Sequence, residues 1–189
     1  MIRSAAAAAL DAVGTQRRVL LQQMLQSKSP DVVATAAQAK DLTSDADLRE
    51  LAFEGVLRFA TKQSESSGIF DVLEKSDRLT LALKLLDHKD MASFHSNLVD
   101  RALDMIDGRK DAKYLAQLIR ASRSEYSNTR HKVAQMLGRT FVPESADPLL
   151  ELLKDDAKEV RAAAQASLDQ IANYLDERAK WEKRFGKAK

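Results

Sequence analysis

The sequence predicts an all-α fold, an α-solenoid of about five stacked antiparallel helix pairs with a long C-terminal capping helix. Three observations favour this fold. The 189-residue chain is 44% hydrophobic and 31% charged, yet has only 6 glycines, 3 prolines and 5% aromatic residues, which suits helices better than many short strands. Apolar residues recur at intervals of three and four, the period of an amphipathic helix. From about residue 77, similar helix pairs return after 33 and then 34 residues.

The N-terminal third predicts three helices with less regular apolar spacing. Pro30 suits the first turn of a helix, and Asp31 suits its positive N-terminal end. Ser44 and Asp45 are of residue types that cap helix N-termini. We therefore expect helices near residues 16–27, 31–40 and 45–62.

A serine-rich polar stretch separates this region from the rest of the chain. Residues 63–68 have the composition of a loop, and a short apolar piece follows at 69–73. We expect a single domain over 1–189, with irregular helices at 1–62 and more regular repeats at 69–189.

The later helix pairs share two sets of apolar positions. The first helices carry Ala82, Leu85 and Leu86, then Leu115, Leu118 and Ile119, then Leu149, Leu152 and Leu153. The second helices carry Val99, Ala102 and Leu103, then Val133, Met136 and Leu137, then Ala164, Ser167 and Leu168. A single pair cannot bury its apolar face, so we expect the pairs to stack around one continuous core.

The last pair has a pattern known from one family. Residues 147–156 form a leucine-rich stretch ending in an aspartate turn, and the next helix opens with Val160-Arg161. This pattern resembles a HEAT repeat. Arg130 holds the place of that arginine one pair earlier, so the resemblance covers about residues 110–175. It implies stacked helix pairs whose second helices line a concave surface.

The resemblance also implies a role for the two arginines. In HEAT-like repeats, an arginine at this position braces the turn between helices by pairing with its aspartate. We expect this role for Arg161, five or six residues after Asp156 and Asp155, and for Arg130. Contact with a ligand is the alternative.

Charge is distributed unevenly along the chain. Residues 40–107 carry 9 basic and 14 acidic side chains, whereas residues 109–139 carry 8 basic and 2 acidic ones. The basic segment is either an anion-binding strip, for an acidic protein segment or a nucleic-acid backbone, or an ordinary solvated face beside an acidic neighbour.

One set of polar residues is the strongest candidate for partner binding. Lys132, Gln135 and Arg139 recur at three and four, partly opposite the apolar positions of their helix, and predict a polar ridge. Arg101 and Gln170 are weaker candidates on neighbouring second helices.

Enzyme chemistry has little support in the sequence. The chain has no cysteine, and it lacks a glycine-rich phosphate loop, a His-Glu-x-x-His motif and a nucleophile elbow. We expect no cofactor and no metal site, because His88 and His95 would lie about 10.5 Å apart on one helix and His131 stands alone. Bilin lyases and alkylpurine DNA glycosylases use HEAT-like scaffolds, but here the single tryptophan, Trp181, lies in the terminal helix.

The two ends of the chain allow alternatives. A long helix over about 159–184 would either cap the stack or dock a partner through its basic tail. No apolar stretch is long enough to cross a membrane. We expect a cytoplasmic location, with a mitochondrial presequence as the alternative for the alanine-rich basic N-terminus.

Taken together, these patterns predict a non-enzymatic protein–protein interaction or scaffold module. A partner helix or peptide segment that carries acidic groups would bind the curved surface of the solenoid. Nucleic-acid binding through residues 109–139 is the alternative, and a HEAT-like enzyme is third.

Overall fold

The computed structural model describes residues 16–39, 42, 44–61, 78–106 and 114–185. Across these ranges the regular structure is α-helix with short 3₁₀ turns, and no strand occurs, which confirms the predicted all-α class. The expected loop at 63–68 and the apolar piece at 69–73 lie outside the described residues. The chain divides into two compact units, 1–85 and 86–189, and the single-domain organisation stays a prediction.

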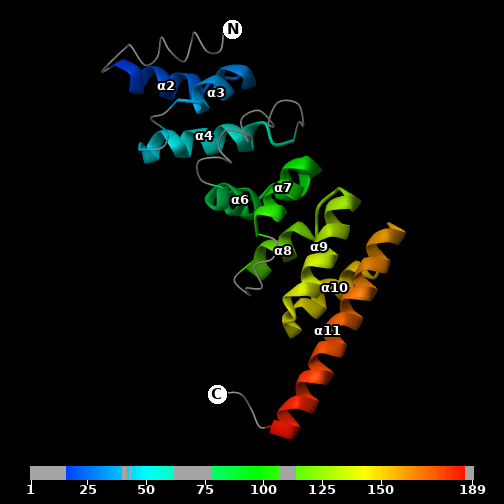
Figure 1. The fold of residues 1–189 in the computed structure, drawn as a ribbon. Helices are drawn as coiled ribbons and strands as arrows, with labels where there is room; N and C mark the ends of the chain where they lie inside the picture. Colours follow the sequence, from blue (N-terminus) through cyan, green and yellow to red (C-terminus); the bar gives the residue numbers. More distant parts are fainter. Residues whose placement is uncertain (1–15, 40–41, 43, 62–77, 107–113, 186–189) are drawn as a thin grey trace. The chain divides into compact units, whose positions relative to one another are not determined.

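In the described part of the first unit, three helices pack against one another. These are α2 (Arg17–Leu25), α3 (Pro30–Ala37) and α4 (Ala46–Arg58), drawn in blue to cyan in Figure 1. The predicted cap is confirmed, because the Asp45 carboxylate accepts hydrogen bonds from the backbone N–H groups of Asp47 and Leu48 at 3.0 and 3.1 Å. Arg18 of α2 reaches the same carboxylate at 2.7 Å and so ties α2 to the start of α4.

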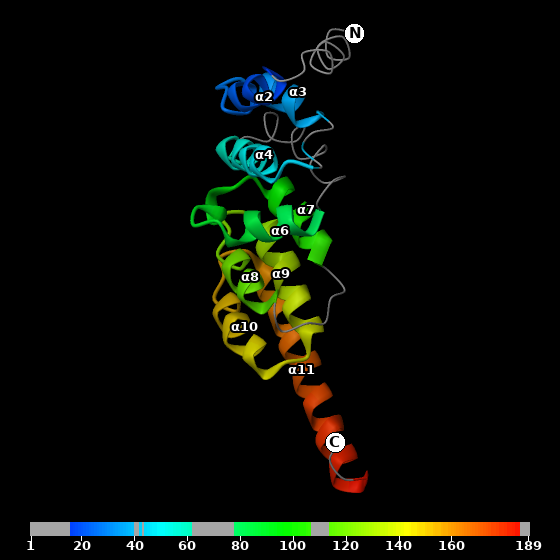
Figure 2. The same cartoon turned by 90° about the vertical axis from the view of Figure 1, so that its left-hand side faces the viewer.

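Helix α6 (Arg78–Asp87) leads from the first unit into the second, whose boundary falls between Leu85 and Leu86. The second unit continues with η3 (Met91–Ser93), α7 (Ser96–Ile106), α8 (Leu115–Ala121), α9 (Ser127–Thr140), η5 (Pro143–Ser145), α10 (Ala146–Leu152) and α11 (Lys158–Phe185). Helices α8 and α10 form one layer, and α7, α9 and α11 form the other (Figure 2). The pairs α8–α9 and α10–α11 are the predicted repeats, and α9 also packs against α7 and α11.

The core of this unit lies between the two layers. The predicted apolar sets of the second helices are buried, with Leu168 alone among them partly exposed. Leu118 of α8 and Leu149 and Leu152 of α10 close the core from the other layer. Burial of these side chains supplies the main stabilising free energy of the stack, because no single helix pair can cover its own apolar face.

Helices α9 and α11 approach each other closely where they cross at Gly138. A Cβ atom added at Gly138 would lie 2.6 Å from the Ser167 Oγ and 3.0 Å from the Ser167 Cα. Only glycine therefore permits this packing distance. Just beyond it, Phe141 ends α9 in the left-handed region, with φ 54°, and its ring packs against Tyr174 of α11 with centroids 4.7 Å apart.

Helix α11 has two distinct halves. Val160, Ala164, Ser167 and Ile171 bury its first half against the stack. From Ala172 onward most described side chains are exposed, and charged residues pair along the helix instead, as Lys180 does with Asp176 at 2.7 Å. The predicted long helix is confirmed, whereas its capping or docking role stays a prediction, and the Trp181 side chain lies outside the described part. None of the described helices is long and apolar enough to span a membrane.

Candidate partner-binding surface

All five predicted contact residues lie in the same layer of helices. Arg101 lies on α7 and Gln170 lies on α11. The other three, Lys132, Gln135 and Arg139, lie on α9. We call this set the second-helix face. Gln135, Arg139 and Gln170 are exposed, while Arg101 and Lys132 are half-buried. The structure thus brings residues from three successive repeats onto one layer, and their contact with a partner stays a prediction.

Lys132 already has partners within the protein. Its ammonium group donates a hydrogen bond to the Asp100 carbonyl oxygen at 2.9 Å and lies 2.7 Å from the Asp104 carboxylate. The Asp100 carboxylate accepts further hydrogen bonds from Thr129 Oγ1 at 2.8 Å and Asn128 Nδ2 at 3.2 Å. Lys132 therefore joins α9 to α7, and most of its charge is compensated there.

Gln135 is held in place through a histidine. His131 Nδ1 lies 3.2 Å from the Glu159 carbonyl oxygen, and since a carbonyl only accepts, Nδ1 carries the hydrogen. The other ring nitrogen, Nε2, lies 2.9 Å from Gln135 Nε2 and, in the tautomer with the hydrogen on Nδ1, accepts from that amide. The amide of Gln135 is thereby oriented, and its oxygen remains available to a partner's N–H group.

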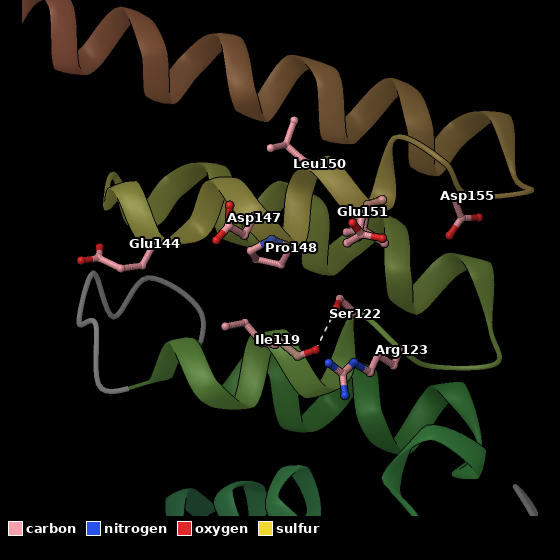
Figure 3. Close-up of a pocket in the computed structure, with 10 residues that line it drawn as sticks. Ile119, Ser122, Arg123, Glu144, Asp147, Pro148, Leu150, Glu151 and Asp155 are labelled. Atoms are coloured by element: carbon pink, nitrogen blue, oxygen red, sulfur yellow. Dashed lines mark hydrogen bonds between the residues drawn. The ribbon is translucent and has the colours of Figure 1, made fainter.

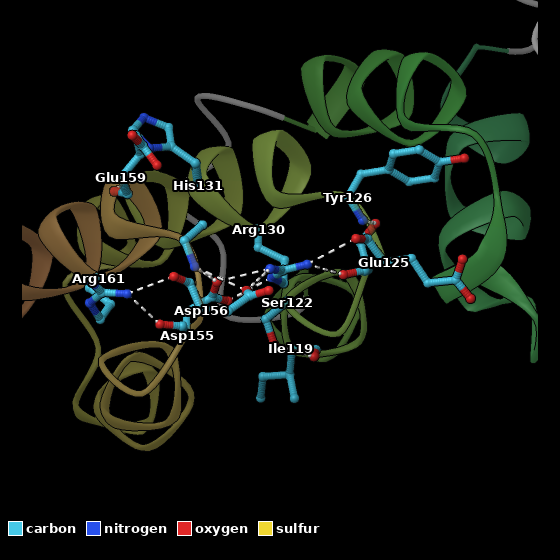
Figure 4. A network of polar contacts seen from close by, with 12 residues as sticks. Ile119, Ser122, Glu125, Tyr126, Arg130, His131, Asp155, Asp156, Glu159 and Arg161 are labelled. Carbon is cyan, nitrogen blue, oxygen red and sulfur yellow. Dashed lines mark hydrogen bonds and ion pairs between the residues drawn. The ribbon is translucent and has the colours of Figure 1, made fainter.

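The turn between α10 and α11 holds an extended polar network (Figure 4). Arg130 of α9 donates from Nε and Nη2 to the two carboxylate oxygens of Asp155, at 2.6 and 2.8 Å. Its Nη1 donates to the carbonyl oxygens of Ser124 and Glu125, at 2.8 and 3.1 Å. The guanidinium group thus joins its own turn to the turn of the next repeat.

Burial and pairing shift the ionisation of this pair. The Arg130 and Asp155 side chains are only 13% and 7% exposed. The hydrogen bond from Arg130 lowers the pKa of Asp155 from 3.8 to about 2, with the Ala157 backbone N–H adding to the effect against the cost of burial. The same hydrogen bond raises the pKa of Arg130. Both groups are therefore charged at neutral pH.

Arg161 braces the same turn, as expected, but through different atoms. Its Nη1 donates to the carbonyl oxygens of Asp155 and Asp156, at 2.7 and 2.8 Å, rather than to a carboxylate. The carboxylates belong instead to Arg130, 25 residues earlier. Sequence reasoning missed this link between repeats, because the pattern places Arg161 closer to the aspartates along the chain.

Over its described residues, 114–139, the basic segment does not form one continuous strip. Residues 109–113 lie outside the described part. Among the rest, Arg120 pairs with Asp87, Arg130 with Asp155, and Lys132 with Asp104. Moreover, Arg120 is on α8, in the layer away from the second-helix face. Acidic groups of neighbouring repeats therefore neutralise most of the described charge. Among the described residues, no group of three or more potential ligands could hold a metal ion.

Comparison with known proteins agrees with this geometry. Residues 82–169 match a family described as HEAT repeats. The match begins at Ala82, the first residue of the predicted apolar sets, and ends one residue after Leu168, the last. A search of curated proteins gave no match.

Proposed function

Since residues 82–169 belong to the HEAT-repeat family, we propose that the chain is a non-enzymatic protein-interaction module that binds a helix or extended segment of a partner through its second-helix face. HEAT repeats generally mediate protein–protein interaction, and members of the family are typically scaffolds without enzymatic activity. A cytoplasmic location is part of the proposal.

One observation carries the proposal. Exposed polar side chains, Gln135, Arg139 and Gln170, lie on two adjacent second helices whose other faces are buried in the core. The close crossing at Gly138 keeps α9 and α11 in fixed contact. A partner would therefore bind a surface that is already ordered, at little entropic cost to the receptor.

The chemistry of this face favours a partner with acceptor groups. Arg139 offers a charged donor, while Gln135 and Gln170 offer amides that donate and accept. A helix or extended segment with carboxylates and exposed backbone carbonyls fits this set. Because Lys132 is already paired with Asp104, we expect binding to weaken only moderately with salt.

Nucleic-acid binding has weaker support. Affinity for a phosphate backbone requires several uncompensated cations along one surface. Here Arg120, Arg130 and Lys132 are paired with carboxylates of neighbouring repeats.

Site-specific photo-crosslinking tests the proposal. A benzoylphenylalanine placed at Gln135 or Gln170 should capture a protein partner in cell extract, and the same residue at Ala116, which is exposed on α8, should not. The variant Gln135→Glu/Arg139→Glu should reduce capture from position 170. Equal capture from position 116, or none from 135 and 170, would contradict the proposal.

A salt titration with mixed DNA and RNA tests the alternative. We expect no micromolar binding, and Arg139→Glu is the better control variant than Lys132→Glu. The latter would bring a third carboxylate beside Asp100 and Asp104, so lost binding could reflect lost folding. Binding that falls steeply with salt and disappears in Arg139→Glu would support nucleic-acid binding instead.

A further inference from the structure

A hollow surface lies in the other layer of the second unit, between α8 and α10 (Figure 3). We call it the α8/α10 groove. Its volume is about 770 Å³. It is lined by Ile119, Ser122, Arg123, Glu144, Asp147, Pro148, Leu150, Glu151, Leu152 and Asp155. None of these belongs to the second-helix face, so the groove is independent of the proposed function.

The apolar walls of the groove are partly exposed to solvent. Ile119 of α8 and Pro148 of α10 are half-buried on facing helices, and Leu152 is buried beneath. Leu150 of α10 also lines the hollow and, at 48% exposed, adds to this apolar surface. A hollow bordered by an exposed leucine favours an occupant with apolar side chains.

Charge in the groove differs between its two ends. Glu144 and Asp147 lie at the N-terminal end of α10, and neither carboxylate has a cationic partner among the described residues. Asp155 is bound by Arg130, and Glu151 lies 3.0 Å from Lys154. The uncompensated negative charge is therefore confined to one end, whereas the exposed Arg123 lies toward the other.

We propose that the α8/α10 groove binds a short extended segment of a partner protein, with lysine or arginine beside Glu144 and Asp147 and apolar side chains against Ile119, Pro148 and Leu150. Charge complementarity fixes the direction of this segment, since a basic residue at the opposite end would meet Arg123. The seven residues of α10 span about 10 Å, the length of about three residues of extended chain. The groove thus suits a short motif rather than a long helix.

A binding titration with a designed peptide tests this inference. The probe is a fluorescein-labelled nine-residue peptide with two lysines at one end followed by alternating leucine and serine, and its control has glutamates in place of the lysines. Fluorescence anisotropy with the whole chain should show binding of the first peptide and not of the second. Binding of both peptides alike, or of neither, would overturn the proposal.

Matched variants separate the groove from general attraction between charges. The variant Glu144→Gln/Asp147→Asn should weaken binding about fivefold, as expected for two exposed charge pairs. The control, Glu125→Gln/Glu159→Gln, changes the net charge by the same amount at exposed positions outside the groove and should change binding less than about twofold.

Two single substitutions sharpen the test. Arg123→Gln should tighten binding, because it removes a repulsive charge, and Leu150→Ser should weaken it without unfolding the protein, because that side chain is half exposed. Circular dichroism checks the fold of each variant. Equal losses in the groove and control variants would refute the proposal. Failure of the second-helix face would appear separately, because Gln135→Glu/Arg139→Glu should leave peptide binding unchanged.

Discussion

The pairing of Arg130 with Asp155 can be tested by the substitution Asp155→Asn, which removes the charge and keeps the shape. The shift of the Asp155 pKa from 3.8 to about 2 corresponds to about 2 kcal/mol of folding stability at neutral pH. Because the side chain is only 7% exposed, solvent screens this contribution little. We expect Asp155→Asn to lower the free energy of unfolding by about that amount at pH 7.

The stability that the Asp155 carboxylate contributes should decrease as the pH falls. A carboxylate whose pKa is depressed in the folded state stabilises the protein above its unfolded pKa of about 4, and the benefit disappears as pH falls through the folded value of about 2. The contribution should fall to about half by pH 3. The difference between wild type and Asp155→Asn should therefore shrink between pH 5 and pH 3.

Urea unfolding followed by circular dichroism measures this difference. The matched control is Asp156→Asn, which removes the neighbouring carboxylate that also accepts from Arg130, at 2.8 Å, but is 90% exposed. We expect it to cost less than about 1 kcal/mol. If Asp155→Asn costs no more than Asp156→Asn, or if its cost does not change between pH 5 and pH 3, the link between the repeats does not stabilise the fold as argued.

Three further predictions concern the packing of the second unit. Gly138→Ala should destabilise the protein by about 1–3 kcal/mol in thermal unfolding, because the added Cβ would lie 2.6 Å from the Ser167 Oγ. Ser167→Gly should restore the stability of this variant. If Gly138→Ala leaves the stability unchanged, the close crossing of α9 and α11 is contradicted. Lys132→Met should cost about 1 kcal/mol and Lys132→Glu more, since the latter opposes the Asp104 carboxylate; equal costs in urea unfolding would count against that pairing. Leu137→Ala should cost about 2–5 kcal/mol, because Leu137 is fully buried in the core, and a cost below 1 kcal/mol would argue against the stack.

Much of the fold could be predicted because helix signals are local. The cap at Asp45 and the apolar sets around Val133 and Leu149 depend only on neighbours within a few residues, so the sequence contains them directly. The return of these sets after 33 and 34 residues likewise predicted which helices form pairs. Boundaries were less accurate: the helix expected at 31–40 ends at Ala37.

The candidate surfaces were harder to predict, because they depend on which repeats touch. Helical spacing placed Gln135 and Arg139 on an exposed side, and the structure agrees. The same spacing gave no sign that Lys132 would meet Asp104 of the preceding repeat, 28 residues away. Two aspartates, Asp100 and Asp104, lie four residues apart on the preceding second helix, and this spacing is the sequence feature that could have indicated the contact.

The sequence by itself determined the helices, their pairing and their buried faces, because propensity, capping and apolar period act over one or two turns. Only the tertiary structure decided which charges remain available. Arg130, Asp155 and Lys132 look like surface charges along the chain, but stacking places each beside an opposite charge from another repeat. Stacking also created the α8/α10 groove, whose walls come from residues about 20–35 positions apart, since a hollow between two helices exists only once their repeats have packed.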